Sequence, residues 1–106
     1  MKSTPDQAIS DLAFLIYLNT IKLFEDEKIE VSKDYFLIEC LKLVAKVKML
    51  EFKISSYNQT ITFELDKEKH SFWLVEIPDV NEKYKFVDYL TSIFLKIFYN
   101  LNKKDF

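Results

Sequence analysis

The spacing of apolar residues changes partway along this chain, and that change limits the folds it can adopt. Apolar side chains recur every three to four residues in the stretches 5–25, 33–48 and 82–102, as they do on amphipathic helices. Between the last two stretches they alternate with polar residues, which is typical of half-buried strands. We therefore predict an α+β protein of order α-α-β-β-β-α, in which helices pack on a three-stranded antiparallel meander.

The predicted strands cover residues 50–54, 60–65 and 70–77. Polar segments at 55–59 and 66–69 separate them, and connections this short join neighbouring antiparallel strands. The first two strands alternate apolar residues with charged or hydroxyl residues. One face of each should therefore be buried against the helices.

The third predicted strand is apolar on both of its faces. Phe72 and Leu74 would point to one face, and Trp73, Val75 and Ile77 would point to the other. The third strand of a meander lies at an edge of the sheet, where one face usually meets water. We expect a second subunit to cover this strand, by pairing along the edge or by packing over Trp73.

The first helix carries a similar excess of apolar surface. Its stripe includes Leu12 and Ile16, while Phe14, Leu15 and Leu18 fill other sides, so we expect it to be buried on several sides. The chain has ten Phe, six Tyr and one Trp, and each ring offers about 150–250 Å² for burial. That is more apolar area than one small core uses.

This surplus predicts a small non-enzymatic interaction or regulatory protein that binds a macromolecular partner. The partner would be another protein or a second copy of the chain in a homodimer. Pairing between final helices, through Phe94, Phe98 and Tyr99, is a variant of the same hypothesis. The expected interface residues are Phe72, Trp73, Val75, Ile77, Phe94, Phe98 and Tyr99.

Two other functions stay open. The first is a binder of an apolar small molecule, whose aromatic helices would line a closed cavity of several hundred Å³ against the sheet. The second is a small metal-dependent nuclease that uses Glu51, Lys53 and either Glu64 or Asp66, because Glu-x-Lys on a strand occurs in such sites. Against it, the acidic residue that should come from a preceding strand is missing, since a helix precedes.

The charge pattern argues against nucleic acid as the partner. The net charge is −2, and every basic residue is a lysine, so no guanidinium fork is available for phosphate or guanine. We interpret the lysine strip of Lys42, Lys46, Lys48 and Lys53 as a solvated surface. The exclusive use of lysine favours an AT-rich genome, such as that of a low-GC bacterium or a mobile element.

Cys40 and His70 are the only residues of their types, and we assign neither to a cofactor or metal site. Cys40 lies on an apolar helical stripe, where free cysteines are commonly buried. His70 follows Glu64, Asp66 and Glu68, which we interpret as solvated hairpin residues, since lysines alternate with them and zinc requires more His or Cys ligands.

Chain length, the single cysteine and the absence of glycine further limit the fold, location and sites of this protein. The 106 residues suit a single domain, 1–106, and the longest uncharged stretch, 12–21, is about half the length of a membrane span. One cysteine forms no intramolecular disulfide, so we expect a cytoplasmic protein without membrane contact. There is no glycine, which excludes phosphate-cradling glycine loops and leaves turns to Asn, Asp, Ser or Lys.

Overall fold

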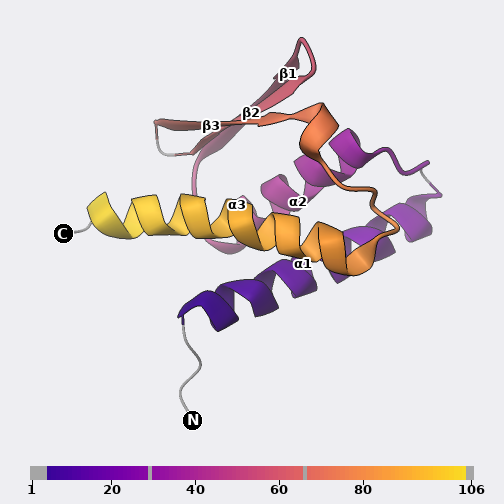
Figure 1. Ribbon diagram of the computed structural model, residues 1–106, viewed down its shortest axis with the longest axis horizontal. Coiled ribbons are helices and arrows are strands. Elements are labelled where there is room, and N and C mark those ends of the chain that lie inside the picture. The colour runs from indigo at the N-terminus through magenta and orange to yellow at the C-terminus, as the bar shows by residue number, and fades with distance from the viewer. Residues whose placement is uncertain (1–4, 29, 66, 105–106) are drawn as a thin grey trace.

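The helices and strands follow one another along the chain in the predicted order, which confirms the α+β class (Figure 1). This computed structural model describes residues 5–28, 30–65 and 67–104, and the side chains of residues 7–28, 30–65 and 67–98. The elements are α1 (Pro5–Glu27), α2 (Lys33–Val47), β1 (Phe52–Tyr57), β2 (Thr60–Leu65), β3 (Glu68–Trp73), the 3₁₀ helix η1 (Leu74–Glu76) and α3 (Lys83–Lys104).

The sheet is an antiparallel meander with the strand order β1-β2-β3. Asn58 and Gln59 alone connect β1 to β2, so Tyr57 pairs with Thr60. Both turn residues have positive φ, 50° and 63°, the combination that matches the twist of a two-residue hairpin. The first strand therefore extends to Tyr57, and the prediction of a turn at 55–59 was wrong because the turn needs only two residues.

The third strand ends at Trp73, well before the end of the predicted strand 70–77. Trp73 pairs with Thr60, the first residue of β2, so β2 offers no partner to the residues beyond it. The chain turns instead into η1, and the Leu74 amide donates to the Gln59 carbonyl at 2.9 Å. The prediction of one long strand with two apolar faces was therefore wrong.

The chain makes its left-handed turns without glycine. Met49 follows α2, where the Leu50 amide donates to Ala45 O at 2.9 Å and the Met49 amide donates to Lys46 O at 3.1 Å. These two bonds form a Schellman helix ending, in which glycine is usual because it lacks a Cβ atom. Methionine and glutamine were not among the residue types expected at such positions. Among the described residues, those with positive φ are Lys28, Met49, Asn58, Gln59 and Lys67.

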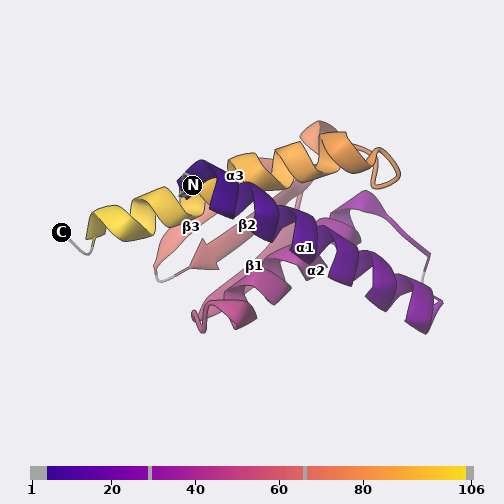
Figure 2. The same ribbon diagram turned by 90° about the horizontal axis from the view of Figure 1, so that it is seen from below.

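The three helices lie on one side of the sheet. α2 contacts β1 and β2, and α1 packs against α2 and α3. Figures 1 and 2 show that α1 is the helix farthest from the sheet, with α2 and α3 between them. One face of the sheet therefore meets helices, and the other does not.

The central strand shows this difference residue by residue. Ile61, Phe63 and Leu65 point to the helices, and each is at most 2% exposed. Thr62 and Glu64, which alternate with them, are only partly buried on the other face. The period-two pattern of the sequence predicted this alternation correctly.

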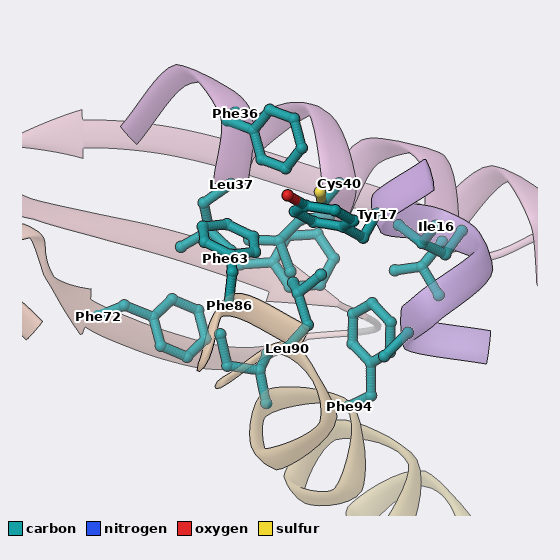
Figure 3. Packing of buried hydrophobic residues seen from close by; sticks show 14 of the residues in the cluster. Ile16, Tyr17, Phe36, Leu37, Cys40, Phe63, Phe72, Phe86, Leu90 and Phe94 are labelled. Carbon is teal, nitrogen blue, oxygen red and sulfur yellow. The ribbon is translucent and has the colours of Figure 1, made fainter. Parts of the chain in front are cut away.

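Aromatic rings fill much of the space between the helices (Figure 3). Phe36 of α2 lies with its ring centroid 5.1 Å from that of Phe86, 5.4 Å from Phe24 and 5.6 Å from Tyr17. The buried Tyr17 hydroxyl donates to the Val80 carbonyl at 2.7 Å. This bond links α1 to the segment just before α3, although the two residues are 63 positions apart in the sequence.

The outer side of α1 is apolar yet exposed. Leu15, Leu18 and Leu23 lie at the surface, so the prediction that α1 is buried on several sides was wrong. The reason is its position as the outermost layer, with neighbours on one side. None of the helices within the described ranges has a stretch apolar enough to cross a lipid bilayer.

Candidate functional site

The face of the sheet turned away from the helices, here called the open face, consists of three cross-strand rows. At one end the row is charged, in the middle it carries hydroxyl groups, and at the β1–β2 turn it is aromatic. The Thr62 and Ser71 hydroxyl oxygens lie 3.2 Å apart and share a hydrogen bond. The rows are Lys53–Glu64–Lys69, Ser55–Thr62–Ser71 and Tyr57–Thr60–Trp73.

Two aromatic side chains occupy one corner of the open face. Tyr57 is 82% exposed and Trp73 is 56% exposed, on either side of Thr60. Neighbouring strands lie about 4.8 Å apart, which places the two Cα atoms roughly 10 Å from each other. Val75, in η1, is 79% exposed. We call Tyr57, Trp73 and Val75 the corner surface.

Hydrogen bonds hold the backbone beneath the corner surface. The Thr60 hydroxyl donates to the Tyr57 carbonyl at 2.5 Å across the turn. The bond from the Leu74 amide to Gln59 O fixes the end of β3 against the same turn. The rings are therefore presented by the hydrogen-bonded end of the sheet, and none of the described helices covers them.

The structure separates the expected interface residues into two groups. Trp73 and Val75 are exposed, while Phe72, Ile77 and Phe94 belong to the core. Phe72 pairs with a core residue of β2, and Phe94 is fully buried among the helices. Since these three side chains already contact their own subunit, they are removed from the candidate surface.

The remaining two expected residues lie near the end of α3. Phe98 is half-buried, and its ring centroid is 6.0 Å from that of Phe94. The Tyr99 side chain lies outside the described residues. The helix-to-helix variant therefore retains only part of its proposed contact.

Sequence reasoning missed Tyr57, the most exposed residue of the corner surface. The predicted turn at 55–59 included it, because Asn58 and the two preceding serines suggested a loop. Alternation from Lys53 through Ser55 would have placed Tyr57 on the open face. The absence of an Asn-Gly pair hid the two-residue turn.

Cys40 has the environment of a core residue. Burial raises the pKa of its thiol to about 12, although the hydrogen bond to Thr20 opposes this increase. The thiol lies 3.5 Å from the Thr20 hydroxyl, which itself donates to Ile16 O at 2.8 Å. A thiol that stays protonated is a poor nucleophile near neutral pH.

His70 is half-buried on the helix side of β3. Burial lowers the pKa of its imidazole; nearby Glu68 opposes this shift, and Lys96 adds to it. Glu64 lies on the open face, so it does not share a face with His70, and Asp66 lies outside the described residues. Within 5–28, 30–65 and 67–104, no group of three His, Cys, Asp or Glu is placed to hold a metal.

The open surface hollows include two that described residues line. The larger, of about 540 Å³, brings together three residues of the nuclease alternative, Glu51, Lys53 and Glu64, at the start of β1. The smaller, of about 310 Å³, lies beside Lys33 and Asp79. Both are open to solvent, unlike the closed cavity that the small-molecule alternative places between helices and sheet.

Two lysines of the predicted strip interact with their own chain. The Lys42 ammonium lies 3.4 Å from a Glu39 carboxylate oxygen. The Lys48 ammonium lies 5.5 Å from the ring centroid of Phe98. These contacts favour the interpretation of the strip as an ordinary solvated surface.

Comparisons of this chain with models of known protein families, with curated proteins and with solved structures found no match. Its function must therefore be inferred from the surface that it presents.

Proposed function

We propose that this chain is a small non-enzymatic interaction protein that binds a protein partner through the corner surface. The observation that carries this proposal is the exposure of Trp73 and Tyr57 in one cross-strand row of the open face, on either side of Thr60. Both side chains lie on hydrogen-bonded strands of the same sheet, so binding requires little ordering of the surface. Binding would regulate the partner by steric occlusion, because this chain would cover part of the partner's surface.

Tryptophan and tyrosine favour this role for energetic reasons. They are the residue types most often found at the energetic centre of protein interfaces, because they bury a large area with few rotatable bonds. In the isolated subunit both rings meet water instead. A partner that covers Trp73, Tyr57 and Val75 would remove that apolar area from water and gain its transfer free energy.

The charges of the open face favour a protein partner over nucleic acid. The charged row of the open face alternates, with Glu64 between Lys53 and Lys69. Phosphate backbones are bound by clustered positive charge, and this chain has a net charge of −2 and no arginine. Exposed aromatic residues next to polar residues of mixed charge are typical of a protein interface.

Affinity capture from an extract of the native host tests this proposal. Wild type and the Trp73→Ala variant are immobilised side by side, and we expect a partner retained by the first to be lost from the second. Tyr84→Ala is the matched control, because Tyr84 is also an aromatic residue, 75% exposed, but lies on α3. Capture should be unchanged in this control.

The captured protein is then added to the free chain while the emission of Trp73 is recorded. We expect the emission to shift to shorter wavelength as the indole becomes covered. Since Trp73 is mostly exposed, its replacement should change the free energy of unfolding by no more than about 1 kcal/mol. Equal capture by wild type and Trp73→Ala would overturn the proposal.

A further inference from the structure

The opposite edge of the sheet, β1, leaves apolar side chains only partly covered. Phe52 and Ile54 of β1, and Leu50 just before it, pack against the core but are only half-buried, unlike Phe63 of the neighbouring strand, which is fully buried. The larger surface hollow also lies here, lined in part by Leu50 and Phe52. The helix layer therefore does not reach far enough to cover β1.

The backbone of β1 is directed to accept another strand. In an antiparallel pair, alternate residues direct both their amide and their carbonyl groups to the partner strand. The two-residue turn makes Tyr57 and Thr60 a hydrogen-bonded pair, so Lys53 and Ser55 also bond toward β2. Phe52 and Ile54 then direct their backbone groups to the free edge.

The segment at this edge is complementary to itself when reversed. In an antiparallel pairing centred on Phe52, Leu50 lies opposite Ile54 of the second copy; the Leu50 carbonyl can accept from that Ile54 amide, while the Leu50 amide stays bonded to Ala45 O. Glu51 lies opposite Lys53 of the second copy, and Lys53 lies opposite Glu51 of the second copy. The two Phe52 side chains face each other at the centre. Apolar residues thus meet apolar residues, and each charge meets its opposite.

This pairing also continues the rows within each subunit. On the open face, the row Lys69–Glu64–Lys53 would extend to Glu51 of the second copy, so that positive and negative charges alternate across four strands. On the helix side, Phe52 is paired with Leu65, and the second Phe52 would extend that apolar row. Opposite charges in directly paired positions stabilise a sheet.

Other registers lack this complementarity. A pairing centred on Lys53 would place the two Lys53 ammonium groups opposite each other. A pairing centred on Ile54 would place Lys53 opposite Ser55 and Glu51 opposite Tyr57, which leaves both charges without an opposite charge. Of these three registers, the one centred on Phe52 alone pairs apolar residues with apolar residues on the helix side and opposite charges on the open face.

We propose that two copies of this chain pair through β1 in the register centred on Phe52, forming a continuous six-stranded sheet. The two-fold axis is perpendicular to the sheet, so both open faces lie on the same side. Trp73, at the end of the far edge strand, and Val75, just beyond it, remain uncovered, whereas Tyr57 belongs to β1, the paired strand itself. The dimer thus presents two copies of Trp73 and Val75, the residues of the corner surface on the far edge, and this arrangement strengthens binding to a partner with two sites.

Sedimentation equilibrium of the full chain and two charge variants tests this pairing. Glu51→Lys places like charges opposite each other twice, and so does Lys53→Glu, so each should weaken self-association at least about tenfold. When the two variants are mixed, each lysine again faces a glutamate. The mixture should form a heterodimer with a dissociation constant within about threefold of the wild-type dimer.

The matched control is Lys69→Glu, which makes the same change of charge on the other edge strand and should leave dimerisation unchanged. Circular dichroism checks that every variant is folded. A wild-type chain that is monomeric at all concentrations, or a mixture that associates as weakly as each variant alone, would overturn the proposal. A loss of dimerisation in Lys69→Glu would overturn it too. Capture through Trp73 is measured separately, so either proposal can fail alone.

Discussion

The two sides of β2 differ in what each residue contributes. On the helix side, Ile61, Phe63 and Leu65 are buried in the core. On the open face, Thr62 shares a hydrogen bond with Ser71 at the surface. The sheet thus concentrates its apolar residues where helices cover it. The exposed aromatic residues at the corner are therefore exceptions that the fold of this subunit does not require.

The largest difference in the free energy of unfolding is expected when adjacent residues on opposite faces of β2 are truncated to alanine. Phe63→Ala should lower the free energy of unfolding by about 3–5 kcal/mol, because it empties a fully buried ring site. Thr62→Ala should lower it by less than about 1 kcal/mol, since the hydrogen bond it removes is exposed. Urea denaturation measures both, and equal losses would contradict the difference between the faces.

A smaller effect is expected where the helix side secures the segment after the sheet. Tyr17→Phe removes the donor to the Val80 carbonyl and leaves that buried oxygen without its partner. We expect a loss of about 1–3 kcal/mol in the free energy of unfolding. Tyr84→Phe is the control, because the Tyr84 hydroxyl is at the surface. A loss of the same size in both variants would show that the buried bond does not hold this segment.

Met49 is exposed, so we expect it to affect the free energy of unfolding through its backbone conformation and not through side-chain packing. Met49→Gly should raise the free energy of unfolding by about 1 kcal/mol, because Met49 has a φ of 56°, which glycine adopts without a steric penalty. Val47→Gly, in the last turn of α2, should lower it by about 1 kcal/mol. Thermal denaturation compares them, and destabilisation by Met49→Gly would contradict the assigned backbone conformation.

The smallest expected effect is a pH dependence from His70. Burial lowers the pKa of this imidazole below its ordinary value of 6.5 in the folded chain. The unfolded chain therefore binds the proton more readily, so stability is fully present above pH 6.5 and falls as the pH decreases below it. His70→Gln should remove this component, so the two unfolding curves should diverge between pH 8 and pH 5.5. Parallel curves would contradict the burial of His70 on the helix side.

The sequence predicted those parts of the fold that depend on local periodicity. The alternation of β2 and the three helices needed only the spacing of apolar residues. The end of β3 was missed because it depends on a pairing partner: Trp73 is the last residue that β2 can bond, since β2 begins at Thr60. The end of a paired strand depends on both strands, so the sequence of one strand alone does not specify it.

The candidate site was predicted in part for the same reason. Periodicity identified Trp73 and Phe94 as apolar positions, but it did not show which layers cover them. Phe94 lies between helices and is buried, whereas Trp73 lies on a face without helices. Tyr57 was missed because a two-residue turn of Asn58 and Gln59 has no glycine to mark it.

The most direct test of the account is collisional quenching of Trp73 by acrylamide and iodide in the free chain. Trp73 is the one tryptophan of the sequence, so its emission reports on the corner surface alone. We predict efficient quenching by both reagents and emission at the wavelength of a largely hydrated indole, in monomer and dimer alike. Blue-shifted emission that neither reagent quenches would show that the chain covers this indole itself, and would contradict the claim that the corner is open for a partner.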